Sequence, residues 1–262
     1  MSYLTVTAGY GHSEGQFMAL AEVRHEIGRR IRNLRRGRIA GVGHDFVGDI
    51  KARLPHLSID TVFDVGAHIG LTALEFSDEF PNAEFYAFEP GSRNFRRMQS
   101  NLVGKPDIRL HNIGFSSVPG EAVLLCEPEH PSMARIVRRG TANTETVKLD
   151  SIDNFCAAAG VKQIDLLKID VEGHEMQVFA GARKMLEESR ISIIRFETAI
   201  DPDLDYHTQF FEAFEFLRPL GYRLFGFYDQ WENTLADSPA LRRFDAAVVS
   251  RAALRRSAQP AQ

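Results

Sequence analysis

The stretch from Thr61 to Gly70 restricts the possible folds more than any other part of the chain. A short apolar run carries Asp64 near its end, a turn bounded by Gly66 and Gly70 follows, and a helical pattern begins at Leu71. In a parallel sheet, this order places a carboxylate and backbone N–H groups at the carboxyl end of a strand, where a helix begins. The stretch therefore predicts the first strand and helix of an open α/β sheet.

A second acidic residue, Glu89, follows the next predicted strand and comes about nineteen residues after the turn. A carboxylate at this place suits a ribose, because two vicinal hydroxyl groups can donate to it. The structural alternative is a tight turn that binds nothing. With Asp64 before the turn and Glu89 after it, we favour a site for a cofactor that contains a nucleoside.

The spacing of the glycine residues distinguishes among such cofactors. Nicotinamide and flavin sites need the pattern G-x-G-x-x-G. Here three residues separate Gly66 from Gly70, and Ala67 and His68 stand where the second glycine would be. His68 would crowd a pyrophosphate but tolerates a ligand without phosphates, such as S-adenosylmethionine (SAM). A P-loop is excluded because no Gly-Lys-Ser/Thr follows.

From residue 59 to residue 250, strand and helix patterns alternate, which predicts a doubly wound, mostly parallel sheet. Residues 114–150 break the alternation and predict an antiparallel insertion with a loop at 127–143. The expected strands of the main sheet are 61–65, 84–88, 108–112, 164–169, 191–196, 222–227 and 246–249, and the helices are 71–80, 92–103, 151–159, 175–188 and 206–217.

The two ends of the chain are expected to lie outside this domain. Residues 1–58 predict a helical N-terminal extension that includes a helix at 45–54 and a glycine-rich lid at 5–17. The arginine-rich run at 29–38 predicts either a solvated helix face or a surface for an anionic partner. Residues 251–262 predict a disordered tail.

Composition and charge exclude several classes of protein. A net charge of -4 gives no reason to expect nucleic acid as a partner. The sequence has neither the apolar run of a membrane span nor the pattern of a secretory signal. Cys126 and Cys156 lack C-x-x-C spacing, which favours a reducing cytoplasm over a disulfide scaffold or a zinc ribbon. We therefore expect a cytoplasmic protein, and the sequence does not predict its oligomeric state.

The segment from Lys168 to His174 is the second dense group of polar residues. Lys168, Asp170, Glu172 and His174 alternate at the end of a buried strand, just before a helix. In a sheet of this type that strand lies beside the first one, so these side chains would lie over the reactive end of a cofactor. The structural alternatives are an ion pair between Lys168 and Asp170, and helix-start roles for Glu172 and His174.

These motifs resemble the FkbM family of SAM-dependent methyltransferases, over about residues 60–250. The resemblance rests on Phe63–Gly70, on Phe88-Glu89-Pro90 with Asn94, and above all on Leu167–Glu175 continuing to Gly181. It implies a class I, Rossmann-like methyltransferase fold. It also implies methyl transfer to a hydroxyl of a saccharide or a polyketide-like natural product.

The resemblance also assigns a set of cofactor-binding residues. Ser117 stands where the family often shows an acid, which leaves Asn112 or the backbone to contact the adenine. A Rossmann-type oxidoreductase and a non-catalytic SAM-binding scaffold stay as alternatives; the glycine spacing opposes the first and the intact acids oppose the second. The expected cofactor-binding residues are Asp64, Gly66, Ala67, His68, Gly70, Glu89, Pro90, Asn94, Asn112 and Asp170.

Methyl transfer to an alcohol is an in-line displacement that benefits from a nearby base. We expect His174 to be that base, because the positive end of a helix keeps the imidazole neutral. Asp170 and Glu172 are the alternative catalytic residues. A divalent metal held by these residues, with Glu197, is a further option. Since no compact His-rich pattern supports it, the sequence predicts no metal ligands.

An aromatic cluster at 225–231 follows the sixth predicted strand of the main sheet. Its rings could stack on the face of a sugar or a macrocycle. The structural alternative is that Phe225 and Phe227 face the core.

Overall fold

The computed structural model describes residue 43 and residues 45–126, 134–137, 143–232 and 240–259. The chain divides into two compact units, residues 1–45 and 46–262. The predicted lid at 5–17 and the arginine-rich run at 29–38 lie outside the described residues, as does most of the predicted loop at 127–143. The architecture described here is that of the second unit.

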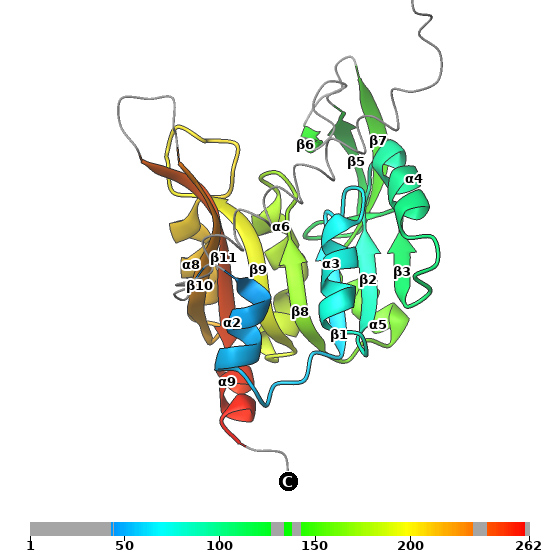
Figure 1. The fold of residues 1–262 in the computed structure, drawn as a ribbon. Coiled ribbons are helices and arrows are strands. Elements are labelled where there is room, and N and C mark those ends of the chain that lie inside the picture. Colours follow the sequence, from blue (N-terminus) through cyan, green and yellow to red (C-terminus); the bar gives the residue numbers. More distant parts are fainter. Residues whose placement is uncertain (1–42, 44, 127–133, 138–142, 233–239, 260–262) are drawn as a thin grey trace, which may run out of the picture. The chain divides into compact units, whose positions relative to one another are not determined.

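The described residues form a main sheet of seven strands in the order β10-β11-β9-β8-β1-β2-β3 (Figure 1). Strands β1, β2, β3, β8 and β9 are parallel, whereas β11 is antiparallel to both of its neighbours. The winding reverses at β1, which lies between β2 and β8, as predicted. The strands are β1 (Thr61–Val65), β2 (Glu84–Phe88), β3 (Ile108–His111), β8 (Ile164–Ile169), β9 (Ile191–Ala199), β10 (Tyr222–Glu232) and β11 (Leu241–Ser250).

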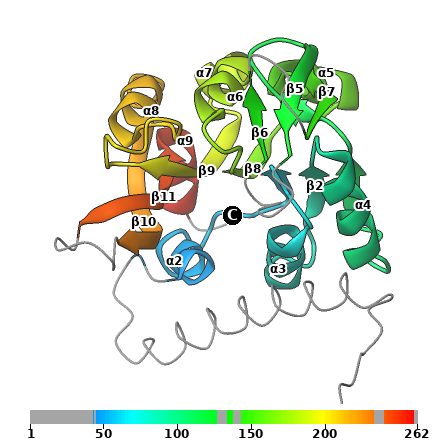
Figure 2. The same ribbon diagram turned by 90° about the horizontal axis from the view of Figure 1, so that it is seen from above.

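Helices cover both faces of this sheet, and Figure 2 shows α2 and α3 on one side and α6, α7 and α8 on the other. Successive side chains of a strand point to opposite faces. In β1, Phe63 and Val65 therefore enter one core and Val62 enters the other. The sheet is doubly wound, as predicted. The helices are α2 (Phe46–Arg53), α3 (Leu71–Glu79), α4 (Ser92–Asn101), α5 (Ile152–Ala159), α6 (Glu175–Gly181), α7 (Arg183–Glu187), α8 (Phe210–Leu217) and α9 (Arg251–Ser257).

The predicted antiparallel insertion forms a second sheet, which contains four strands among the described residues. These are β4 (Gly114–Phe115), β5 (Gly120–Leu125), β6 (Arg135–Val137) and β7 (Thr144–Asp150). Strand β5 pairs antiparallel with β6 and with β7. In Figure 1 this sheet lies beyond the carboxyl ends of β2 and β3.

The prediction of a disordered tail at 251–262 is wrong for residues 251–257, which form α9. The hydroxyl of Ser250 caps this helix by accepting a hydrogen bond from the backbone N–H of Ala253 at 3.1 Å. Ala253 is buried in the core beside α2. The capping pattern and the buried alanine explain why the helix continues past the last strand.

Other boundaries also differ from the sequence prediction, and β9, β10 and β11 are longer than expected. Helix α2 was assigned to the N-terminal extension, but Phe46 and Ile50 are buried in the core of the second unit. The helix expected at 175–188 is divided into α6 and α7, next to Gly181, a poor helix former. Helix α8 begins at Phe210, four residues later than expected. Tertiary packing determines these ends more than local propensity does.

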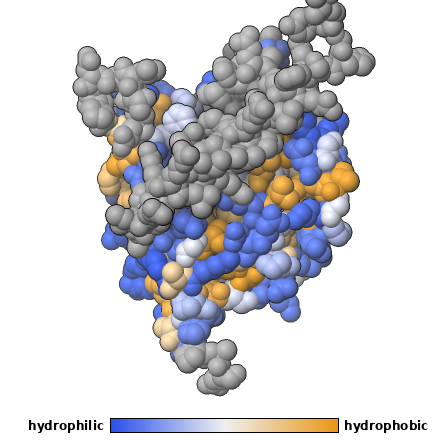
Figure 3. Space-filling model, viewed as in Figure 1, coloured by the Kyte–Doolittle hydropathy of each residue, from blue (hydrophilic) through white to orange (hydrophobic). Residues whose placement is uncertain are grey.

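The visible surface of the described residues is mostly polar, with smaller apolar areas between the polar ones (Figure 3). Exposed large hydrophobic side chains include Val103, Phe211 and Trp231. Within the described ranges, no helix combines the length and the apolar character that a bilayer crossing requires.

Candidate active site

A cavity of about 490 Å³ lies at the carboxyl ends of β1, β2 and β8. Its volume falls within the range of about 300–1,000 Å³ that is usual for small-molecule sites. Leu124 and Ile136 of the second sheet form part of its wall. The predicted site residues that line it are Gly66, His68, Glu89, Pro90, Asn94, Asp170, Glu172 and His174.

Glu89, directly after β2, is held by backbone groups at one end of the cavity. Its carboxylate accepts hydrogen bonds from the N–H of His68 at 2.9 Å and from the N–H of Gly91 at 2.8 Å. The side chain of Asn94 also hydrogen-bonds to it. Glu89 is only 5% exposed, and this burial raises its pKa to about 7. A fixed carboxylate that still has unused lone pairs can accept hydroxyl groups of a ligand.

The turn after β1 is shaped by close contact with the end of β8. Gly66 has a φ of +77°, and a Cβ atom there would overlap the carbonyl oxygen of Asp170. His68 has a φ of +51° and lines the cavity. Burial lowers the pKa of His68 to about 4, so its imidazole is neutral. The turn is therefore held close to the end of β8, with the neutral ring of His68 at the cavity.

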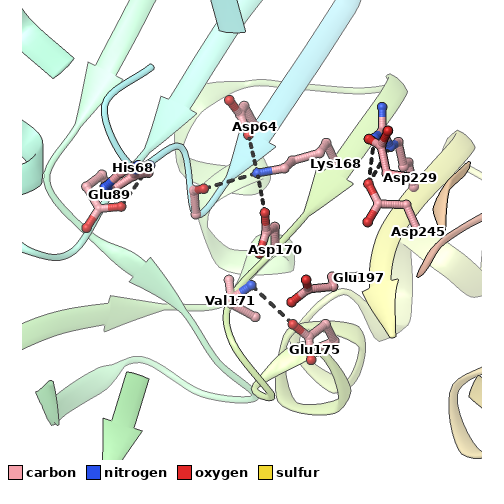
Figure 4. Close-up of polar contacts among 12 residues, drawn as sticks. Asp64, His68, Glu89, Lys168, Asp170, Val171, Glu175, Glu197, Asp229 and Asp245 are labelled. Atoms are coloured by element: carbon pink, nitrogen blue, oxygen red, sulfur yellow. Dashed lines mark hydrogen bonds and ion pairs between the residues drawn. The ribbon is translucent and has the colours of Figure 1, made fainter. Parts of the chain in front are cut away.

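Asp64 lies behind the cavity wall, not in it, and is 1% exposed. Lys168 Nζ is 3.1 Å from Asp64 Oδ1 and 3.5 Å from Asp170 Oδ2 (Figure 4). It also donates a hydrogen bond to the carbonyl oxygen of Gly66 at 3.1 Å. Burial lowers the pKa of Lys168, but the two carboxylates outweigh it and raise the pKa above its ordinary value. The ion pair between Lys168 and Asp170, given above as the structural alternative, is therefore present, and Asp64 joins it.

Three other predicted cofactor residues take supporting positions. The side chain of Asn112 donates to the carbonyl oxygens of Glu89 and Pro90, at 2.8 and 2.9 Å. Gly70 packs against Met98 and Leu102 of the segment that contains α4. Ala67 is buried in the core. None of the three is among the described residues that line the cavity.

The loop between β8 and α6 is held by a buried carboxylate. Glu175 accepts hydrogen bonds from the backbone N–H groups of Val171 and Gly173, at 3.1 and 3.3 Å, and from the hydroxyl of Thr208 at 2.5 Å. Glu172 lies in the same loop with a φ of +51°. The loop thus presents Asp170, Glu172 and His174 on a fixed backbone.

His174 is the residue immediately before α6, as predicted. Its Nε2 atom lies 3.0 Å from the hydroxyl oxygen of Ser116, a residue that follows β4. Burial lowers the pKa of His174, which keeps the ring neutral. The contact with Ser116 helps to orient the ring.

A second group of titratable side chains consists of Glu197 of β9 and Arg243 of β11, which line the cavity, and His207, which precedes α8 and contacts Glu197. Arg243 Nη1 lies 2.8 Å from Glu197 Oε1, and His207 Nδ1 lies 3.5 Å from Glu197 Oε2. Burial raises the pKa of Glu197 to about 9, and the neighbouring carboxylates of Asp170 and Glu172 add to the effect. The same two causes, burial and then repulsion by Asp170, raise the pKa of Glu172 to about 7.

The aromatic cluster predicted at 225–231 is divided between the core and the cavity. Phe225 is buried in one core, and Phe227 packs against Phe244 in the other. Trp231 lines the cavity and is 58% exposed, with Arg243 positioned 4.8 Å from its ring centre. Tyr206 lines the cavity as well. These two rings offer flat apolar surface to a ligand.

Sequence reasoning missed several residues of the site, including Tyr206, which lines the cavity. Ser116, His207 and Arg243 come from separate elements and carry no motif of their own. Glu197 was considered as an additional metal ligand beside Asp170, Glu172 and His174, whereas the structure groups it with Glu172 and His207. The sequence does offer one signal for the pair of Glu197 and His207, because an acid and a histidine flank the end of the strand predicted from residue 191.

Comparison with known proteins identifies a family and several relatives of this chain. The family model described as "Methyltransferase FkbM domain" matches residues 64–224, more than half of the chain. The chain is 29% identical over 144 residues to the hexuronic acid methyltransferase AglP of Haloferax volcanii, covering 55% of this chain and 58% of that protein. It is 28% identical over 148 residues to the 2-O-methyltransferase NoeI of Sinorhizobium fredii, covering 49% and 60%.

The chain thus spans about three fifths of the length of these relatives. Among solved structures, a methyltransferase FkbM from Methylobacillus flagellatus aligns with a TM-score of 0.47 at 16% identity, covering 71% of this chain and 44% of that one. Since the family model matches more than half of the chain and includes the motifs after β1, β2 and β8, the chain belongs to the methyltransferase FkbM domain family.

Proposed function

We propose that this protein transfers a methyl group from SAM to a hydroxyl oxygen of a saccharide or a polyketide-like natural product. Membership of the methyltransferase family supports the reaction class and SAM as the donor. The names of the relatives, a hexuronic acid methyltransferase and a 2-O-methyltransferase, support a hydroxyl-bearing acceptor. The observation that carries the proposal is Glu89, a carboxylate fixed by two backbone N–H groups at one end of the cavity.

The cofactor would lie between Glu89 and the end of β8. The ribose hydroxyls would donate to Glu89, and Gly66, His68, Pro90 and Asn94 would surround the rest of the nucleoside. Asp64 and Asn112 would act without touching it, because Asp64 holds Lys168 and Asn112 holds the backbone of Glu89. The methionine end would then point toward Asp170, on the side where His174 and Glu172 line the cavity.

In the proposed reaction, the acceptor oxygen forms a bond to the methyl carbon while the bond from that carbon to sulfur breaks. S-adenosylhomocysteine leaves, and the hydroxyl proton passes to a base. We assign this role to His174, whose pKa is lowered by burial. If Nε2 carries the hydrogen and donates it to Ser116, then Nδ1 is free to accept the proton. Asp170, which is engaged by Lys168, and Glu172 are the alternative bases.

Ligand-induced thermal stabilisation tests the proposal and its two alternatives together. A ligand at one hundred times its Kd stabilises the native state by about 2.7 kcal/mol. SAM and S-adenosylhomocysteine should both raise the melting temperature, and NAD should not. Stabilisation by NAD alone would instead indicate a Rossmann-type oxidoreductase. Methyl-labelled SAM, incubated with hexuronic-acid saccharides and other polyhydroxylated acceptors, then separates an enzyme from a non-catalytic SAM-binding scaffold.

A further inference from the structure

Three side chains with metal-binding atoms converge at the end of the cavity opposite Glu89. Glu172 follows β8, Glu197 lies on β9, and His207 precedes α8. One ligand atom from each lies within 4.8 Å of the others. Because β8 and β9 are parallel neighbours, their carboxyl ends bring Glu172 and Glu197 together although they are far apart in the sequence. Glu172 and Glu197 also line the cavity.

The imidazole of His207 lacks the hydrogen bonds that its burial calls for. Its side chain is only 2% exposed, and Nε2 has no hydrogen-bond partner among the described residues. Nδ1 lies 3.5 Å from Glu197 Oε2, an oxygen that is itself buried and without a hydrogen bond in the described part of the chain. Buried polar atoms without partners are unfavourable. A cation between His207 Nδ1 and Glu197 Oε2 would give that oxygen a partner and would bind the buried imidazole.

The ion pairs around this group leave carboxylate oxygen atoms available to bind a cation. Arg243 offsets one carboxylate through its 2.8 Å contact with Glu197 Oε1. That contact leaves Oε2 of the same carboxylate facing His207. Lys168 forms its ion pairs with Asp64 and Asp170. The group thus offers carboxylate oxygen atoms to a cation beside a neutral imidazole.

We propose that Glu172, Glu197 and His207 bind one divalent transition-metal cation, such as Mn²⁺ or Zn²⁺, in the cavity. Two carboxylates and one imidazole are a ligand set that these metals accept, whereas Mg²⁺ and Ca²⁺ prefer oxygen ligands alone. Three protein ligands leave coordination positions for water or for an oxygen of the acceptor. The role in orienting an acceptor rests on the proposed function, but the binding of the cation does not.

Metal titration of the full chain tests this site without SAM or an acceptor. The protein is treated with EDTA, freed of chelator, and titrated with MnCl₂ while the signal of free Mn²⁺ is followed by electron paramagnetic resonance. A parallel calorimetric titration uses ZnCl₂. We expect one cation per chain. The variants Glu197→Gln and His207→Gln should each bind it at least about one hundredfold more weakly, since changes even of outer-shell partners reduce metal affinity by about 10–100-fold.

The control variant is Glu212→Gln, an exposed acid on α8, which should bind the cation like the unaltered protein. Thermal unfolding without metal checks that each variant is folded. If His207→Gln does not fold, Glu172→Gln in the half-buried loop replaces it. Absence of saturable binding up to millimolar metal, or equal binding by the variants and the unaltered protein, would overturn the site. Neither result would affect SAM binding at Glu89, so the two proposals fail separately.

Discussion

The carboxylate of Glu89 accepts a hydrogen bond from the backbone N–H of His68, with 2.9 Å between the nitrogen and Oε2. This bond joins the end of β2 to the turn after β1. A second bond, from the N–H of Gly91 to Oε1, fixes the other oxygen. The carboxylate is therefore oriented before any ligand arrives, which reduces the entropy lost on binding.

Replacing Glu89 with alanine should weaken SAM binding by about one to two orders of magnitude. The ribose hydroxyls would lose a charged acceptor, and each such hydrogen bond contributes about 1.5–3 kcal/mol. Titration calorimetry measures the change. Glu84→Gln, at the exposed start of the same strand, is the control and should leave the Kd unaltered. Unchanged SAM affinity in a folded Glu89→Ala protein would remove Glu89 from the cofactor site.

The affinity for SAM should fall as the pH drops below about 7. Burial raises the pKa of Glu89 to about 7 in the unliganded protein, so the carboxylate takes up a proton in this range. Only the ionised form accepts hydrogen bonds from both ribose hydroxyls, and binding must then displace that proton. Below the pKa, the affinity should decrease by up to about tenfold per pH unit. Calorimetry at pH 5.5–8 should show this slope in the unaltered protein and a flat profile in Glu89→Gln; two equal profiles would contradict the assignment.

Gly66→Ala should destabilise the protein more than Gly104→Ala does. Both glycines have positive φ values, +77° and +86°. Around Gly104 there is open space, so alanine there should cost only the backbone strain of about 1–2 kcal/mol. At Gly66 the added Cβ overlaps the carbonyl oxygen of Asp170, and the end of β8 must move. Urea unfolding should show a further loss of more than about 2 kcal/mol; equal losses would mean that the contact between turn and strand is not tight.

His174→Ala should lower kcat by about 10²–10⁴-fold while the affinity for SAM stays nearly constant. The reason is that the side chain acts on the acceptor proton and not on the cofactor. Added imidazole should restore part of the activity. Ser116→Ala should produce a smaller loss, because it only orients the ring. His56→Ala, an exposed histidine outside the cavity, is the control. Full turnover in His174→Ala would contradict the assignment. The reaction would then depend on substrate positioning alone, or on Asp170 or Glu172 as the base.

Much of the fold follows from local patterns in the sequence. The apolar runs at 61–65, 84–88 and 164–169 coincide with β1, β2 and β8, because each is short, buried on both faces and ended by a polar residue or a turn. The neighbour relation of β1 and β8 follows from the topology of doubly wound sheets. The positions of Glu89 and His174 at the cavity could be predicted from the same topology, since strand ends and helix starts of such a sheet converge at one edge.

The remaining contacts depend on packing between distant segments. Ser116 meets His174 because the second sheet folds back over the carboxyl ends of the main one, and no local pattern in the sequence indicates this pairing. His207 reaches Glu197 through the irregular stretch before α8, where the prediction placed a helix. Asp64 was expected to contact the cofactor. It is instead buried beside Lys168, because the register of β1 against β8 pairs these two residues, and the sequence alone does not give that register.

A crystal structure of the protein with S-adenosylhomocysteine tests the central claim most directly. The account predicts that both ribose hydroxyls lie within hydrogen-bond distance of the Glu89 carboxylate. It also predicts that the sulfur lies beyond the Gly66 turn, facing the part of the cavity lined by Glu172 and His174. A nucleoside bound elsewhere, or a ribose that makes no contact with Glu89, would contradict it.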